Sequence, residues 1–451
     1  MQIRILTFLL AISLAASAQD STFNKTDLNS VAKVFDLTFT QKEIDTLYSD
    51  VKDNLYNYKS MHKLTLNNAT PLSMWQTPVV SGMKFNTVQQ PVKWGTINAL
   101  SVPANKNELA FYSIEQLAYL IKNKKISSVD LTRFFIERIK NYGDTLQCLI
   151  SLTEDLALEQ AKQADAEIAT GKYKGLLHGI PYGLKDLFAV KGTKTTWGAE
   201  PYKNQMIDED AYVYAKLKEA GAVLVAKFTL GALAMGDYWY GGRTKNPWNL
   251  KYGSSGSSAG STSATVAGLV PFAIGTETWG SIVSPSTTCG ATGLRPTFGT
   301  ISRSGAMALS YSLDKVGPIC RSAADAAVVF NYLHGTDGKD LSAVNMPFNY
   351  DAAKPVKNYK IAYAKNYFDK IKDTTRAEWV ALKAFEKMGV TLIPVNFPDS
   401  GVYKFNIMDV IIGVECAAQF DDLTRSNQDD ALTRQTKNDW PNQFRTARFV
   451  P

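Results

Sequence analysis

Apolar side chains recur at helical spacing in several segments of the chain. Ser113-Ile-Glu-Gln116 matches a capping box, and it opens a predicted helix whose apolar face includes Ile114, Leu117 and Ile121. Further helices are predicted at residues 40–58, from Ser128 onwards, at 155–169 and at 377–388.

Short apolar runs lie between these helices. They predict buried strands at residues 222–226, 359–363 and 390–394. Because strands that alternate with helices are typical of α/β proteins, the pattern predicts an α/β fold with a substantially parallel sheet.

The first residues have the pattern of a secretory signal peptide. Arg4 gives a positive start, residues 5–15 are apolar, and Ala16-Ser-Ala18 has the form of a cleavage site. The apolar stretch is shorter than the ~20 residues needed to span a bilayer. We therefore expect residues 1–18 to be removed before Gln19, and the mature protein to be periplasmic or secreted, without stable membrane insertion.

The segment at residues 19–109 is polar and rich in Asn and Lys, and we expect it to form an N-terminal extension. The tighter pattern of helices and strands from residue 110 predicts a main domain at 110–451.

Composition narrows the function classes. The 451 residues include 11% aromatics and 20% charged residues, which is typical of a globular protein and not of a disordered one. The net charge of +7 is spread along the chain, so no nucleic-acid partner is expected. The four cysteines are far apart and predict neither a zinc site nor a disulfide framework, and we expect buried free thiols.

A serine-rich run at residues 253–263 is the densest signal in the chain. Such a run is often a flexible linker, but this one leads directly into an apolar segment at 264–274 that must be buried. Small residues entering a buried helix let the backbone approach a ligand closely. Gly256-Ser-Ser-Ala-Gly260 also fits the G-x-S-x-G nucleophile elbow, but the only histidine downstream to act as base is His334.

A lysine offers another base for a serine nucleophile. Lys185 interrupts an apolar, strand-like run, where an unpaired ammonium would be costly to bury. Burial disfavours the charged form of a lysine and lowers its pKa towards neutrality. The alternative is a surface pair of Lys185 with Asp186, which the apolar neighbours disfavour.

These residues resemble the motifs of the amidase signature family. The family's lysine motif matches residues 179–186, its Gly-Ser-Ser loop matches 256–260, and its third block matches Gly275-Thr-Glu-Thr-Trp-Gly-Ser-Ile282. The spacing of Ser257 and Ser281 agrees with the family's spacing. The resemblance covers residues 110–451 and implies an amidase-signature fold, with a large mixed central β-sheet flanked by α-helices.

The resemblance also implies a catalytic Ser–cis-Ser–Lys triad. Ser281 would attack the amide carbonyl, Ser257 would follow a cis peptide bond and relay the proton, and neutral Lys185 would act as the base. Backbone N–H groups of Thr278, Trp279, Gly280 and Ser281 would form the oxyanion hole.

The chain departs from the family pattern at several positions. Trp279 stands where a glycine is usual, Val283 replaces an arginine, and Ser255 replaces the first glycine of the serine loop. A glycine-only backbone conformation would be strained at Trp279. Family members usually continue beyond Pro451, so we expect a truncated domain with an exposed sheet edge.

The sequence thus predicts an exported enzyme that hydrolyses a carboxylic amide of a small molecule or peptide, without metal or cofactor. Two alternatives stay open: a catalytically impaired secreted binding protein on an amidase scaffold, and the glutaminase subunit of a tRNA-dependent amidotransferase. The expected export argues against the second, and the sequence leaves a homodimer open.

Overall fold

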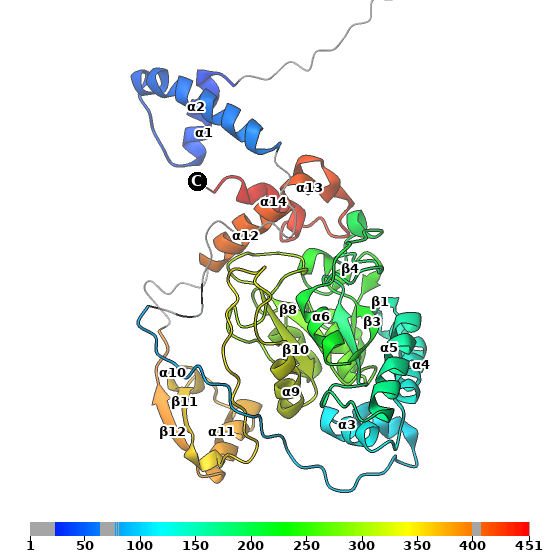
Figure 1. Ribbon diagram of the computed structural model, residues 1–451. Coiled ribbons are helices and arrows are strands. Elements are labelled where there is room, and N and C mark those ends of the chain that lie inside the picture. Colours follow the sequence, from blue (N-terminus) through cyan, green and yellow to red (C-terminus); the bar gives the residue numbers. More distant parts are fainter. Residues whose placement is uncertain (1–22, 64–76, 78, 80, 399–406, 451) are drawn as a thin grey trace, which may run out of the picture. The chain divides into compact units, whose positions relative to one another are not determined.

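The computed structural model describes residues 23–63, 77, 79, 81–398 and 407–450, so the predicted signal peptide lies outside the described residues (Figure 1). The chain divides into two compact units, one comprising Met1–Leu66 with Pro451 and the other Asn67–Val450. The boundary falls inside the extension expected at residues 19–109.

The first unit contains two helices, α1 (Lys25–Val34) and α2 (Gln41–Met61). Thr40 caps α2, because its hydroxyl accepts from the Glu43 N–H while the Glu43 carboxylate accepts from the Thr40 N–H. The helix predicted at residues 40–58 is confirmed.

The second unit is built on a six-stranded sheet in the order β1-β3-β2-β8-β10-β9. Its strands are β1 (Leu149–Leu152), β2 (Pro181–Lys185), β3 (Val223–Phe228), β8 (Ala273–Glu277), β9 (Thr292–Gly293) and β10 (Lys315–Cys320). β2 runs parallel to β3 and β8, whereas the β1–β3, β8–β10 and β9–β10 pairings are antiparallel. The sheet is therefore mixed, as the family resemblance implies. The prediction of a substantially parallel sheet is correct only for the central strands β3, β2 and β8.

Helices accompany both faces of this sheet. They are α3 (Ile114–Lys122), α4 (Ser128–Leu146), α5 (Glu154–Ala169), α6 (Tyr212–Glu219), α7 (Ala259–Val266), α8 (Val283–Cys289) and α9 (Ala323–Leu333). The helices predicted from Ser113, from Ser128 and at 155–169 correspond to α3, α4 and α5. The reciprocal bonds of the Ser113–Gln116 capping box are both formed.

The alternation of side chains along β3 shows how the sheet separates two cores. Val223 and Val225 pack in one apolar cluster with residues of α4, α5 and α7. Leu224, between them, belongs to the other cluster, with residues of α3, α6 and α9. Because successive side chains of a strand point to opposite faces, one strand contributes to both cores.

The strands predicted at 359–363 and 390–394 are present but form a separate sheet. β11 (Lys360–Ala364) and β12 (Thr391–Val395) pair in parallel, and α10 (Lys365–Phe368) and α11 (Ala377–Lys387) lie between them in sequence. The last described segment contains α12 (Ile407–Gln419), α13 (Asp421–Arg425) and α14 (Trp440–Ala447), drawn in orange to red in Figure 1. Short strands occupy the loop before α7: β4 (Tyr238–Trp239), β5 (Gly242–Arg243), β6 (Lys245–Asn246) and β7 (Asn249–Gly253).

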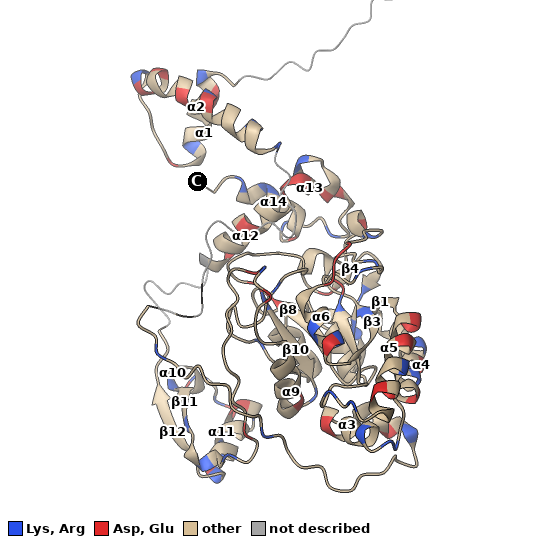
Figure 2. Ribbon diagram, in the orientation of Figure 1, with Lys and Arg blue, Asp and Glu red and all other residues tan. Residues whose placement is uncertain are grey.

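Charge and cysteine placement agree with the sequence pattern. Acidic and basic residues are mixed along α4 and α5 (Figure 2). All four cysteines, Cys148, Cys289, Cys320 and Cys416, are buried and free, as expected. None of the helices in the described ranges has the length and the apolar character that a bilayer-spanning segment needs.

Candidate active site

Lys185 ends β2, a strand in which every residue is buried. Its Nζ lies 2.9 Å from Ser257 Oγ, 2.8 Å from Thr276 Oγ1 and 3.2 Å from Ser258 Oγ. The side chain is fully buried. The sheet and the serine loop, which are far apart in sequence, thus place a lysine against three hydroxyl groups.

The surroundings of Lys185 favour its neutral form. Burial lowers the pKa of the ammonium to about 7, against the smaller opposing effect of the Asp314 and Glu277 carboxylates. A substantial fraction of Lys185 is therefore an uncharged amine at neutral pH, able to accept a proton.

Asp186 does not pair with its neighbour in sequence. Its Oδ1 lies 2.8 Å from Nζ of Lys227, and both side chains are fully buried. The surface pair of Lys185 with Asp186 is therefore absent. Among the residues that the structure describes, Lys185 has only hydroxyl and carbonyl groups within hydrogen-bond distance.

The serine loop holds Ser257 against this lysine. The peptide bond between Gly256 and Ser257 is cis, which confirms that expectation from the family resemblance. A Cβ on Gly256 would lie 1.9 Å from the Gly236 carbonyl oxygen, so this position requires glycine. Ser255 has φ +63°, the left-handed conformation that the usual glycine adopts readily, and its Oγ lies 2.8 Å from Ser284 Oγ.

Ser281 lies in the loop that joins β8 to α8. Its carbonyl accepts from the Ser258 N–H at 3.0 Å, which fixes it beside the serine loop. In the described part of the chain, Ser257 Oγ is hydrogen-bonded to Lys185 and has no hydrogen bond to Ser281. The structure thus joins two of the three predicted residues directly and brings the third to the adjoining loop.

Buried polar contacts hold the loop before Ser281. The Thr278 hydroxyl donates to Asp314 Oδ1 at 2.5 Å, and the Thr278 carbonyl accepts from Lys315 Nζ at 2.9 Å. Glu277 accepts from the N–H groups of the first residues of the following helical turn, Ile282 and Val283, at 2.9 Å each. The side chains of Asp314, Lys315 and Glu277 thus hold this loop in place.

The backbone around Trp279 suits an oxyanion hole. Since C=O and N–H point in opposite directions across a trans peptide, the Trp279 N–H points away from Lys315. Among the residues that the structure describes, the N–H groups of Trp279, Gly280 and Ser281 have no acceptor. Trp279 is not among the residues with positive φ, whereas Gly280 has φ +98°. The expected strain at Trp279 is therefore absent, because the glycine beside it takes the left-handed conformation.

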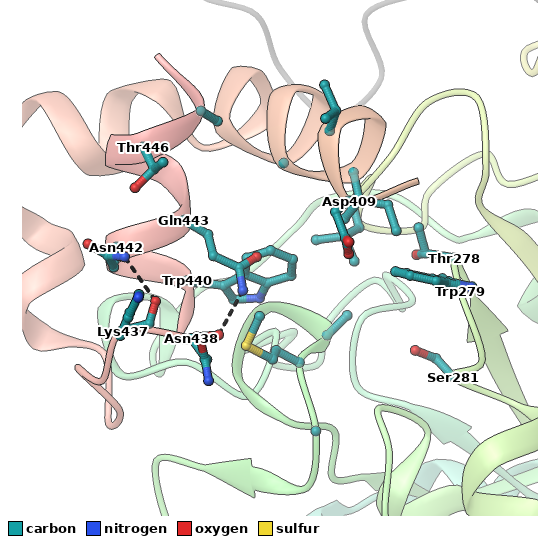
Figure 3. Close-up of a pocket in the computed structure, with 18 of the residues that line it drawn as sticks. Thr278, Trp279, Ser281, Asp409, Lys437, Asn438, Trp440, Asn442, Gln443 and Thr446 are labelled. Carbon is teal, nitrogen blue, oxygen red and sulfur yellow. Dashed lines mark hydrogen bonds between the residues drawn. The ribbon is translucent and has the colours of Figure 1, made fainter. Parts of the chain in front are cut away.

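A cavity of about 610 Å³ opens over Thr278, Trp279 and Ser281 (Figure 3). Its other walls come from residues 234–236 and from the C-terminal segment, through α12 and α14. The Trp279 indole is 51% exposed and lines this cavity. A molecule in the cavity would contact both the loop of Ser281 and the C-terminal helices.

Other catalytic arrangements find no support at this site. Neither His178 nor His334 lines the cavity, and His334 Nδ1 lies 3.3 Å from the carbonyl oxygen of Phe330. Within the described part of the chain, no cluster of His, Cys, Asp and Glu has the arrangement of a metal site.

Sequence reasoning missed several groups at the site. Thr276 belongs to the motif that contains Ser281, so the motif could have been used to predict its contact with Lys185. Asp314 and Lys315, which hold Thr278, lie in a separate block of the sequence and had no assigned role. No local signal marked Asp409 or Trp440 as residues of the cavity.

Comparisons with known proteins identify the family of the chain. The profile of the family described as Amidase matches residues 130–449. The peptide amidase of Stenotrophomonas maltophilia has the same fold, with a TM-score of 0.66 and 28% identity, each chain being covered to 75%. The mixed sheet with flanking helices is thus the fold of amidase-signature enzymes, and the chain belongs to the amidase signature family.

The curated relatives carry a more specific name. In Coxiella burnetii, the A subunit of glutamyl-tRNA(Gln) amidotransferase is 41% identical over 294 residues, which are 63% of this chain. The protein of the same name from a Marinomonas species is 40% identical over 295 residues. The chain spans about 61% of the length of the first relative and 60% of the second.

Proposed function

We propose that this protein hydrolyses a carboxylic amide through a serine acyl-enzyme, with Ser281, Ser257 and Lys185 as its catalytic residues. The observation that carries the proposal is the fully buried Lys185 amine at 2.9 Å from Ser257 Oγ, beside the loop of Ser281. A buried amine with a pKa near 7 and a hydroxyl partner is suited to accept a proton.

Each residue has a defined role in this reaction. Ser281 Oγ attacks the carbonyl carbon while its proton passes to Ser257 Oγ, whose own proton passes to Lys185 Nζ. N–H groups of residues 278–281 stabilise the oxyanion. The C–N bond then breaks, the departing nitrogen takes the proton back through Ser257, and water cleaves the resulting ester on Ser281.

Labelling with a fluorophosphonate, read by intact mass, tests the activated serine. We expect one adduct on the wild type, none on Ser281→Ala, and an unchanged adduct on Ser426→Ala, which removes an exposed hydroxyl outside the cavity wall. Folded wild type that takes up no label would favour the binding-protein alternative.

The glutaminase subunit of an amidotransferase is the second candidate, because the curated relatives carry that name at 40–41% identity. Ammonia release from glutamine separates the two. Release only in the presence of partner subunits would support the amidotransferase, and hydrolysis of other amides by the purified chain would support the free-standing amidase.

Export is a proposal from the sequence pattern of residues 1–18. The N-terminal sequence of the protein recovered from its native compartment tests it. A chain that begins at Gln19 outside the cytoplasm would support export, and a chain that keeps residues 1–18 in the cytoplasm would contradict it.

A further inference from the structure

The cavity over Ser281 contains an acidic side chain that the proposed triad does not use. Asp409 lies in the first turn of α12, and the only other ionisable side chain of the cavity wall, among the described residues, is Lys437. Asp409 is exposed. In the described ranges its carboxylate has neither a hydrogen bond nor an ion pair.

An aromatic ring lines the same cavity. The Trp279 indole is half exposed and lines the cavity. Trp279 lies two residues before Ser281, at a position where the family resemblance predicts glycine. Figure 3 shows Asp409 on the Trp279 side of the cavity in this view, and Lys437 on the opposite side, beyond Trp440.

These two groups favour one kind of ligand. An indole face attracts cations through its quadrupole, and an unpaired carboxylate attracts them by charge. Both attractions are stronger in a partly enclosed cavity than in open water, because fewer water molecules compete. A neutral amide would use the ring alone, and an anionic amide would be repelled by Asp409.

We infer that the enzyme prefers amides that carry a positively charged ammonium group, held between the Asp409 carboxylate and the Trp279 indole. This inference rests on the proposed amidase function and adds the substrate class. Trp279 then serves twice: its backbone faces the reacting carbonyl oxygen, and its side chain contacts the charged part of the substrate.

Matched pairs of amides test the inference, with the full chain at pH 7. The pairs are phenylalaninamide with 3-phenylpropanamide, and 6-aminohexanamide with hexanamide, which differ by one ammonium group at two distances from the carbonyl. Two quantities are measured: kcat/KM for hydrolysis, and protection of the wild type from fluorophosphonate labelling.

We expect the cationic member of at least one pair to be favoured by about ten-fold in hydrolysis or in protection. Asp409→Asn should bring that ratio close to one. Asp422→Asn is the matched control, because it removes the same charge from α13, outside the cavity wall, and should keep the ratio.

Each other outcome overturns the inference. Equal behaviour of both members of both pairs, a preference that survives Asp409→Asn, or a preference for an anionic amide such as glutaramate would contradict it while leaving the amidase intact. A wild type that takes up no fluorophosphonate would overturn the amidase proposal and this inference together.

Discussion

Lys185 combines complete burial with hydroxyl partners and, among the described residues, no carboxylate within hydrogen-bond distance. A lysine kept for stability would be expected to have an ion-pair partner, as Lys227 has in Asp186. The contrast between these two buried lysines, which lie on adjacent strands, indicates that Lys185 is kept for its chemistry.

Replacing Lys185 with methionine should separate chemistry from stability. We expect the rate of fluorophosphonate labelling to fall by roughly 10²–10⁴-fold, the range of general-base catalysis. The free energy of unfolding, measured by urea denaturation, should be unchanged or higher, because the variant no longer has to bury an amine. A variant that is strongly destabilised would show that Lys185 is structural.

The pH dependence of labelling should follow Lys185. Because the proposed base is the neutral amine and its pKa is about 7, labelling should rise about ten-fold per pH unit below that value and level off above it. The carboxylates that face Lys185, Asp314 and Glu277, oppose the effect of burial and so raise this midpoint. A rate that is flat from pH 5 to 9 would contradict the assignment of the base.

Helix α7 shows how closely the serine loop is packed against the sheet. A Cβ on Gly260 would lie 2.4 Å from the Cys148 carbonyl oxygen and 2.5 Å from the Thr229 backbone nitrogen. These contacts involve backbone atoms, so they cannot relax by rotation of a side chain. The serine motif therefore reaches Lys185 only because its small residues let α7 approach the strands.

Gly260→Ala should therefore destabilise the fold by about 1–3 kcal/mol or more and reduce labelling. Gly143→Ala is the control, since it is also a buried helical glycine but its Cβ would meet nothing closer than 3.6 Å. The control should be neutral or slightly stabilising, because alanine favours the helix. Equal Tm values for the two variants would contradict this packing.

Local signals predicted the elements better than their assembly. The capping boxes at Thr40 and Ser113 and the small-residue loop each depend on neighbours a few residues away, so the sequence displays them directly. Strand direction depends on the path of the loop that enters each strand. β10 runs antiparallel to β8, and β11 pairs with β12 outside the central sheet. No local sequence pattern predicts either arrangement.

At the scale of the whole molecule, the site also combines residues that local motifs predict with residues that only the assembled fold brings together. Lys185, Ser257 and Ser281 lie in motifs that could be recognised before the fold was known. The cavity over Ser281 is also lined by Asp409 and Trp440, which are remote in sequence and carry no motif. Only the packing of the C-terminal segment brings these two residues to the cavity over Ser281.

Every residue placed at the site belongs to the unit Asn67–Val450. We therefore expect a chain without residues 1–66 to label with fluorophosphonate at the rate of the full chain, because separate compact units keep their own cores. Circular dichroism must first show that the shortened chain is folded. Loss of labelling in a folded shortened chain would show that the first unit contributes to the site.

In the proposed reaction, Ser281 forms the acyl-enzyme. Peptide mapping of the fluorophosphonate adduct by tandem mass spectrometry tests it most directly, because it distinguishes Ser281 from Ser257 and Ser258, which share the site. The adduct is predicted on Ser281, with no signal on the other two. An adduct on Ser257 or Ser258 would contradict the assignment of nucleophile and relay, and would require the roles of the two loops to be exchanged.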